Sequence, residues 1–129
     1  MTQPLSMAQQ IAQTAIAFED KRLGRKPTSA TVVLGGDTVV ITMHGVLSPA
    51  EKALAASPAG AAQLQEFHQK LFQLSSDPLR REITRITGLE IGEVAKEKAT
   101  AAVQVFSVGT MVQVFLLAGR LPADSWDGT

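Results

Sequence analysis

The stretch AAVQVFSVGTMVQVFLLAG, at residues 101–119, sets the architecture of this chain. None of its residues is charged, and its length alone would allow a membrane span. Its internal pattern favours another structure, because Val-Gln-Val-Phe at 103–106 recurs at 112–115 with Gly109 between the copies. Alternation, β-branched residues and a central glycine are typical of a β-hairpin, whereas two glutamines in one span would be costly. We therefore expect a hairpin rather than a membrane helix.

The expected hairpin is apolar on both faces. Pairing around Val108 and Gly109 would place Gln104 beside Gln113, but valine is poor at positive φ, so the register stays open. In that register one face carries four valines and the other carries Phe106, Met111 and Phe115. Because helices can cover only one face in so short a chain, we expect the other to pack on a second copy or a partner.

The residues expected at such a dimer interface are Val105, Phe106, Met111 and Phe115. Val105 and Phe106 are adjacent in the sequence and point to opposite faces, so at most one of these two lies in the interface and the other is core.

Upstream, residues 28–34 and 38–44 alternate as strands, with Gly35-Gly36-Asp37 supplying positive φ for a tight turn. Helical spacing predicts a helix over 5–23, which Gly24 ends. Ser48-Pro49-Ala50-Glu51 forms a capping box, and Ser57-Pro58 and Ser76-Asp77-Pro78 begin two further helices. Residues 89–97 begin as a strand.

This order, α-β-β-α-α-α-β-β, predicts an α+β fold with an antiparallel sheet of 4–5 strands and helices packed on one face. We expect one domain over residues 1–121. Residues 122–129 read as a polar C-terminal tail, frayed except where Trp126 docks.

The composition is that of a globular protein with balanced charge. The 129 residues include 12 Lys and Arg, 12 Asp and Glu, and no Cys. A balanced charge provides no excess of positive charge for binding nucleic acid. The lack of cysteine excludes disulfides and thiolate chemistry. Residues 1–10 have neither the basic nor the apolar region of a signal peptide. We expect a cytoplasmic protein that does not insert into the membrane.

Residue patterns predict no catalytic, cofactor-binding or metal-binding site. The two histidines, His44 and His68, lie in different elements without a ligand at helical spacing. The capping box accounts for Glu51, and no Gly-x-Ser-x-Gly elbow activates a serine. Arg25 and Lys26, in the loop after the first helix, could hold an anion or contact a partner, although short basic pairs are usually solvated.

The segment GRKPTSATVVLGGDTVVITMHGVLSPAEKAL, residues 24–54, resembles the MpsC-domain family. Members show a Gly-[Arg/Lys]-Gly-Pro turn, matched at 24–27 with Lys26 in place of Gly, and a Gly-Val-Leu-Thr-Pro-Ala-Glu helix opener, matched at 45–51 with Ser48 in place of Thr. A later Thr-Gly and a closing Val-x-Val-Phe-x-Leu correspond to residues 87–88 and 112–117. The resemblance covers about residues 5–118.

The resemblance implies the small soluble member of a bacterial sodium-translocating, membrane-potential-generating system that is also linked to inorganic-carbon supply. It carries over no catalytic residues. We therefore expect a non-enzymatic accessory or interaction protein, a homodimer, with a membrane transporter subunit as a further partner. Two alternatives stay open: a regulator that binds a small ligand between sheet and helices, and an enzyme, which the lack of a poised acid, base or nucleophile disfavours.

Overall fold

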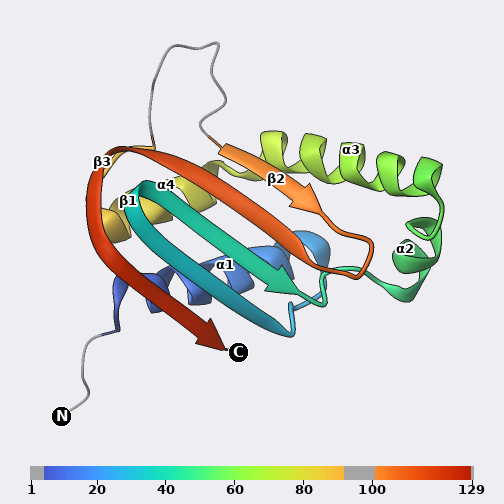
Figure 1. Cartoon of the computed structure of the whole chain (residues 1–129), viewed down its shortest axis with the longest axis horizontal. Coiled ribbons are helices and arrows are strands. Elements are labelled where there is room, and N and C mark those ends of the chain that lie inside the picture. The colour runs from blue at the N-terminus through green and yellow to red at the C-terminus, as the bar shows by residue number, and fades with distance from the viewer. Residues whose placement is uncertain (1–4, 92–100, 129) are drawn as a thin grey trace.

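The computed structural model describes residues 5–91 and 101–128. Within these residues, four helices and three strands follow one another in the order α1, β1, α2, α3, α4, β2, β3 (Figure 1). Their bounds are α1 Met7–Leu23, β1 Ser29–His44, α2 Pro49–Leu54, α3 Pro58–Ser75, α4 Asp77–Thr87, β2 Ala101–Val105 and β3 Met111–Gly128. The fold is α+β with an antiparallel sheet, as the sequence predicts.

Local sequence explains where the helices begin and end. The hydroxyl oxygen of Ser6 accepts a hydrogen bond from the Gln9 amide at 3.1 Å, and Gly24 ends α1 with a φ of 66°. Ser57 caps α3 in the same way, by accepting from the Gly60 amide at 3.0 Å. Such side chains satisfy amides that have no partner within the helix, while glycine reaches positive φ without steric cost.

The sheet is built around the pairing of β1 with β3. The strand order is β1-β3-β2, and both β1 and β3 are long and bend back sharply (Figure 1). On one side of the bend Val39 pairs with Phe115, and on the other Val32 pairs with Trp126. Gly36, with a φ of 57°, lies at the bend, where the register shifts. The pairing therefore continues around the turn.

The prediction of 4–5 strands is not matched, because the sheet formed by the described residues has three. Residues 28–34 and 38–44 were expected as separate strands, but they belong to the single strand β1, which stays paired with β3 across the glycine turn. The strand expected over 89–97 contributes only an isolated bridge between Ile91 and Leu117, and residues 92–100 lie outside the described part of the chain.

The expected frayed tail is also corrected, because residues 122–128 belong to β3. Their polar side chains act as hydrogen-bond acceptors. Asp124 Oδ2 accepts from the Ala8 amide in the first turn of α1 at 2.9 Å, and Asp127 Oδ1 accepts from the Thr31 hydroxyl at 3.0 Å. Trp126 packs against the core, as expected.

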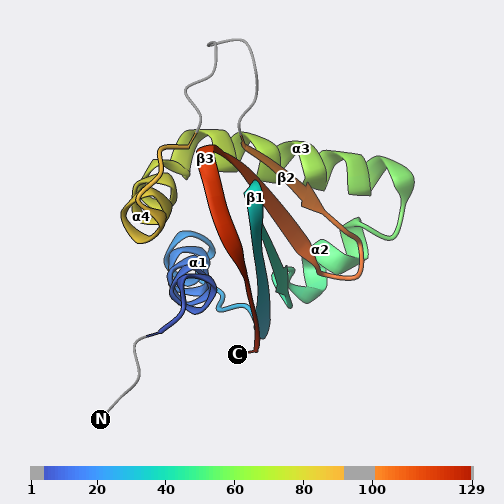
Figure 2. The same cartoon turned by 60° about the vertical axis from the view of Figure 1, so that its left-hand side comes forward.

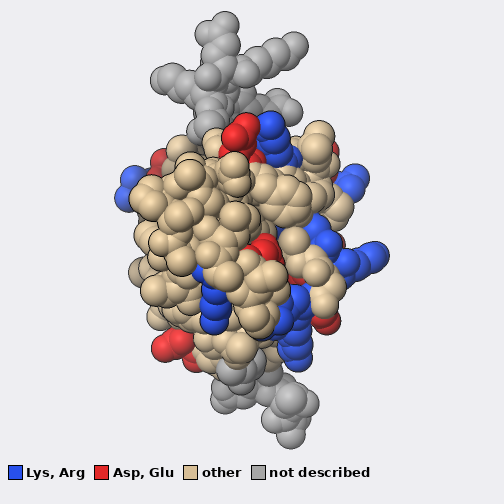
Figure 3. All heavy atoms as spheres, turned by 90° about the vertical axis from the view of Figure 1, so that its right-hand side faces the viewer, with Lys and Arg blue, Asp and Glu red and all other residues tan. Residues whose placement is uncertain are grey.

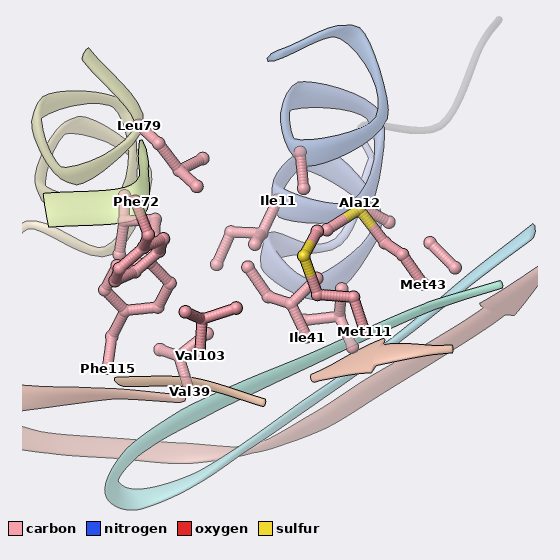
Figure 4. Close-up of a cluster of buried hydrophobic side chains, with 14 of the residues drawn as sticks. Ile11, Ala12, Val39, Ile41, Met43, Phe72, Leu79, Val103, Met111 and Phe115 are labelled. Carbon is pink, nitrogen blue, oxygen red and sulfur yellow. The ribbon is translucent and has the colours of Figure 1, made fainter. Parts of the chain in front are cut away.

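One face of the sheet is buried against helices. In Figure 2, α1 and α4 lie together on one side of the strands. Figure 4 shows side chains from α1, α3, α4 and all three strands meeting there, and Phe72 and Phe115 pack with ring centroids 5.7 Å apart. The buried set alternates along each strand, as a half-buried sheet requires: Ala30, Val32 and Leu34, then Val39, Ile41 and Met43, with Val103, Val105, Met111, Phe115 and Leu117.

The register of the final hairpin assigns its faces differently from the sequence prediction. Val105 pairs with Met111, and Gln104 pairs with Val112 rather than Gln113. This is a shift of one residue, which exchanges the two faces of a strand. Phe106 donates its amide to the Thr110 carbonyl at 2.8 Å, so a longer turn than expected closes the hairpin.

Three of the four residues predicted at a dimer interface are consequently core. Val105, Met111 and Phe115 are buried against the helices, and only Phe106 is exposed, at the turn. The outward positions of the sheet are instead Val33, Val40, Val112, Val114 and Leu116, which we call the open sheet face. Val33 and Leu116 are 49% and 41% exposed, and Val40, Val112 and Val114 are half-buried.

The free edge of β2 is occupied by a side chain from α3. Gln65 Oε1 accepts from the Val105 amide at 2.7 Å, and Gln65 Nε2 donates to the Val103 carbonyl at 2.9 Å. The side-chain amide of Gln65 thus makes the two hydrogen bonds that a neighbouring strand would make at this point. It protects an edge that could otherwise pair with another chain.

We predict that Phe115→Ala lowers the free energy of unfolding by about 3–5 kcal/mol, because it opens a cavity beside Phe72. The neighbouring change Leu116→Ala, on the exposed side, should cost about 0.5 kcal/mol or less. Urea denaturation followed by circular dichroism measures both. Equal losses at the two positions would contradict the observed register.

Candidate functional site

A pocket of about 610 Å³ lies where the end of α1 meets α2 and α3. Figure 3, which views the side on which α2 lies, shows acidic atoms set in a hollow with Lys and Arg atoms gathered beside them. The lining residues are Arg22, Leu23, Gly24, Arg25, Val46, Ser48, Glu51, Phe67 and Leu71. We call this hollow the corner pocket. It differs from the ligand site expected between sheet and helices, where core side chains fill the space (Figure 4).

Two loops fix the polar rim of the corner pocket. The loop after α1 and the loop after β1 are joined by a hydrogen bond from the Thr28 amide to the His44 carbonyl at 2.9 Å. Arg25 Nε donates to the Gly45 carbonyl at 3.2 Å, which anchors its guanidinium across both loops. Gly45 has a φ of 69°, and a Cβ there would lie 2.7 Å from the Thr28 side chain, so the close approach of the loops needs glycine.

The capping box predicted at the start of α2 is confirmed, and it holds Glu51 at the pocket. The Glu51 amide donates to Ser48 Oγ at 3.2 Å, while Glu51 Oε1 accepts from the Ser48 amide at 3.1 Å. The other carboxylate oxygen, Oε2, lies 3.3 Å from Nε2 of His68. Burial tends to raise the pKa of Glu51, but hydrogen bonds from Ser48 and His68 outweigh it, so the pKa of Glu51 lies below its ordinary value of 4.5.

His68 is almost fully buried on α3, and its ring supports Glu51. A carboxylate only accepts hydrogen bonds, so the ring nitrogen Nε2 that faces it must carry a proton. The other ring nitrogen, Nδ1, is buried and has no hydrogen-bond partner within the described residues. The sequence left His68 as an unassigned histidine, because nothing in its spacing links it to Glu51.

Arg25 and Lys26, predicted together as an anion or partner contact, are not brought together. Arg25 lines the corner pocket, whereas Lys26 lies at a separate hollow of about 300 Å³ with Gln13, Ile16, Ala17 and Asp20 from α1. The structure thus places the two side chains at separate hollows, and a joint contact of the pair with an anion or partner stays a prediction.

Sequence reasoning missed a buried polar cluster behind the pocket. Glu19 is fully buried, accepts from Arg22 Nη2 at 2.6 and 2.7 Å, and accepts from Gln113 Nε2 at 3.0 Å. Arg22 also donates to Ser75 at 3.2 Å and lies over the Phe18 ring, 5.1 Å from its centroid. The signal was present in Gln113, because an amide on the core face of an otherwise apolar strand needs a buried partner.

The described residues contain neither a membrane-spanning helix nor a cluster of metal ligands. None of the helices there combines the length and hydrophobicity that crossing a bilayer requires. Over the same residues, no group of three or more His, Asp or Glu side chains is placed to hold a metal ion. Residues 101–105 and 111–128 form antiparallel strands, which confirms the hairpin expected for residues 101–119.

The chain belongs to the MpsC family, described as the Na⁺-translocating membrane potential-generating system, whose family model matches residues 4–116. The resemblance seen in the sequence is thereby confirmed. A curated relative is the uncharacterized protein YbcI of Bacillus subtilis strain 168, which is 24% identical over 116 residues, covering 90% of this chain and 89% of the relative. No solved structure matches significantly.

We predict that Ser48→Ala lowers the free energy of unfolding by about 1 kcal/mol, because the first turn of α2 loses its side-chain cap. Chemical denaturation of the variant and the wild type provides the measurement. A variant as stable as the wild type would show that the capping box contributes nothing to folding.

We also predict a pH dependence at Glu51. Since folding lowers the pKa of this carboxyl, ionised Glu51 stabilises the fold above its ordinary pKa, and that stabilisation is lost as pH falls through the folded-state pKa. The stability difference between the wild type and Glu51→Gln should therefore be largest near neutrality and shrink below about pH 4. Denaturation curves at several pH values measure it. If the stability difference between the two proteins grew as the pH fell, the pKa of Glu51 would be raised by folding, which would contradict the lowered pKa.

Proposed function

We propose that this chain is a non-enzymatic accessory component of an MpsC-type system that works in the cytoplasm by binding other protein surfaces. Its family membership supports the connection to a membrane-potential system. The observation that carries the mode of action is the open sheet face, whose five apolar side chains point away from the buried face of the sheet. We propose a second copy of the chain as its first occupant.

The chemistry of the open sheet face supports protein contact. Val114 lies in the middle strand, between Val40 and Ala102, and the next row across the strands is Thr42, Val112 and Gln104. None of these side chains is charged. A contiguous apolar surface bordered by small polar side chains is typical of an interface, since charged residues are depleted at interface centres.

A twofold dimer suits this surface better than an open chain of subunits. In a twofold interface the same patch meets itself, and an uncharged sheet face meets its copy without repulsion between like charges. Two sheets pack face to face about 10 Å apart, so the valine rows of both copies would interdigitate. A membrane subunit of the same system is the further partner that we propose, bound by the dimer.

We predict that the wild type is a dimer at a protein concentration of about 100 μM, which lies above the micromolar Kd of a modest interface. The variant Val114→Asp should be a folded monomer at the same concentration. Burying an unpaired carboxylate in the interface would be costly, whereas the separated chain leaves it in water. Light scattering measures mass, and circular dichroism checks folding.

Leu74→Asp is the matched control for that experiment. Leu74 lies on α3, away from the open sheet face, and is 85% exposed, so the same change from an apolar to an acidic side chain should leave the dimer intact. A monomeric wild type, or a Val114→Asp variant that stays dimeric, would contradict the proposed interface.

The accessory role is tested separately, by co-expressing the tagged chain with a membrane subunit of the same organism's system and purifying in detergent. We expect the membrane subunit to elute with the wild type at a fixed ratio. A wild-type preparation that contains the folded dimer but no membrane subunit would contradict the accessory role. It would not contradict the proposed dimer.

A further inference from the structure

We propose that the corner pocket binds a small zwitterion of the amino-acid class, with the ligand's carboxylate on Arg25 and its ammonium group on Glu51. The inference concerns a site lined by residues other than those of the open sheet face, and it does not depend on the accessory role. It rests on three features of the pocket: a fixed cation, an ionised carboxylate and an apolar wall.

The fixed cation is the guanidinium of Arg25. Its Nε is held by the Gly45 carbonyl at 3.2 Å, and within the described residues its two terminal nitrogens make no hydrogen bond or ion pair. An anchored guanidinium presents a planar fork that matches the two oxygens of a carboxylate. Because Nε is engaged with the backbone, the two terminal nitrogens are left to contact a ligand.

The anionic partner is Glu51, whose side chain is 31% exposed and lines the same pocket. Its lowered pKa keeps it ionised at neutral pH. Oε1 and Oε2 each have one partner, Ser48 and His68, and a carboxylate has about four acceptor sites in all. Acceptor capacity therefore remains for the N–H groups of an ammonium.

The pairing of charges selects the ligand class. A simple anion attracted by Arg25 would be repelled by Glu51, and a simple cation would meet the opposite conflict. A molecule that carries both charges can contact both residues at once, with its carboxylate on Arg25 and its ammonium group on Glu51. Phosphate groups, with two charges on one side, fit this arrangement poorly.

An apolar wall completes the pocket and sets the side chain that we expect. Phe67, which is 54% exposed, and Leu71 project from α3, and Leu23 and Val46 lie in the lining as well. A volume of about 610 Å³ lies within the usual range for small-molecule sites and leaves room for an aromatic or branched side chain. Amino acids such as phenylalanine or leucine therefore fit better than glycine.

Unsatisfied polar atoms beside the pocket support a functional reading. Arg22 lines the pocket and His68 contacts Glu51, and each has one buried nitrogen, Nε and Nδ1 respectively, without a hydrogen-bond partner in the described structure. Most buried polar groups in proteins are paired, so these two atoms, together with Gln113 Oε1 in the polar cluster that Arg22 joins, make this end of the fold unusual.

The experiment uses L-phenylalanine as the probe, with two analogues that each lack one charge. Isothermal titration calorimetry and thermal unfolding should show saturable binding and a raised Tm with L-phenylalanine. 3-Phenylpropionate lacks the ammonium group and phenethylamine lacks the carboxylate, so both should bind at least about tenfold more weakly. L-Leucine should bind, and glycine should bind more weakly than either.

Variants place the binding at the corner pocket. Arg25→Gln should weaken L-phenylalanine binding by about tenfold or more, since it removes the charged fork. Lys26→Gln is the matched control, because Lys26 is the next residue yet lies at another hollow, and its affinity should stay that of the wild type. Both variants should fold normally, which circular dichroism verifies.

Three results would overturn the proposal. The first is no saturable binding of L-phenylalanine or L-leucine up to about 10 mM, well above the millimolar affinities of the weakest specific ligands. The second is 3-phenylpropionate binding as tightly as phenylalanine, which would leave only an anion site. The third is an equal loss of L-phenylalanine affinity in the Arg25→Gln and Lys26→Gln variants. Light scattering on the same samples reports the dimer, so failure here and failure of the interface are told apart.

Discussion

The pairing of β1 with β3 around a common bend is the constraint on which the rest of the molecule depends. Because both strands turn at the same place, around Gly36, one ladder supplies most of the sheet and brings residues 29–34 against residues 124–128. The same pairing decides which side chains face the helices. It also carries Asp124 to the first turn of α1, so the end of the sheet anchors the helix that covers it.

The buried face joins apolar packing to one polar cluster with defined partners. Glu19 links α1 to Gln113 in the central strand, and Arg22 links the same carboxylate to Ser75 at the end of α3. A buried ion pair adds little net stability, but removing one partner leaves an unpaired charge inside the protein. The cluster therefore favours one arrangement of α1, α3 and β3, and it holds Arg22 in place behind the corner pocket.

Local signals in the sequence predicted local structure well. Serine caps at Ser48 and Ser57 and the glycine stop at Gly24 are set by a few neighbouring residues, and all are present. The turn expected at Gly36 is instead a bend within the single strand β1. Long-range pairing was harder to predict. A one-residue error in the hairpin register placed Met111 and Phe115 outside, and polar residues 122–128 gave no sign that β1 was their partner. Arg25 was singled out, but Glu51 and His68 could be joined to it only by the fold.

The two surfaces proposed to act are built from different residues of this framework, and both follow from the same register. If Val103 pairs with Gln113 and Val105 with Met111, Gln113 reaches Glu19 and Val112 and Val114 remain outside. The most direct test is the pattern of inter-strand nuclear Overhauser effects between α-protons. Closely opposed antiparallel pairs, with Cα atoms about 4.5 Å apart, give strong ones. We predict strong contacts between Val103 and Gln113 and between Val105 and Met111. A contact between Gln104 and Gln113 instead would contradict the register and, with it, both surfaces.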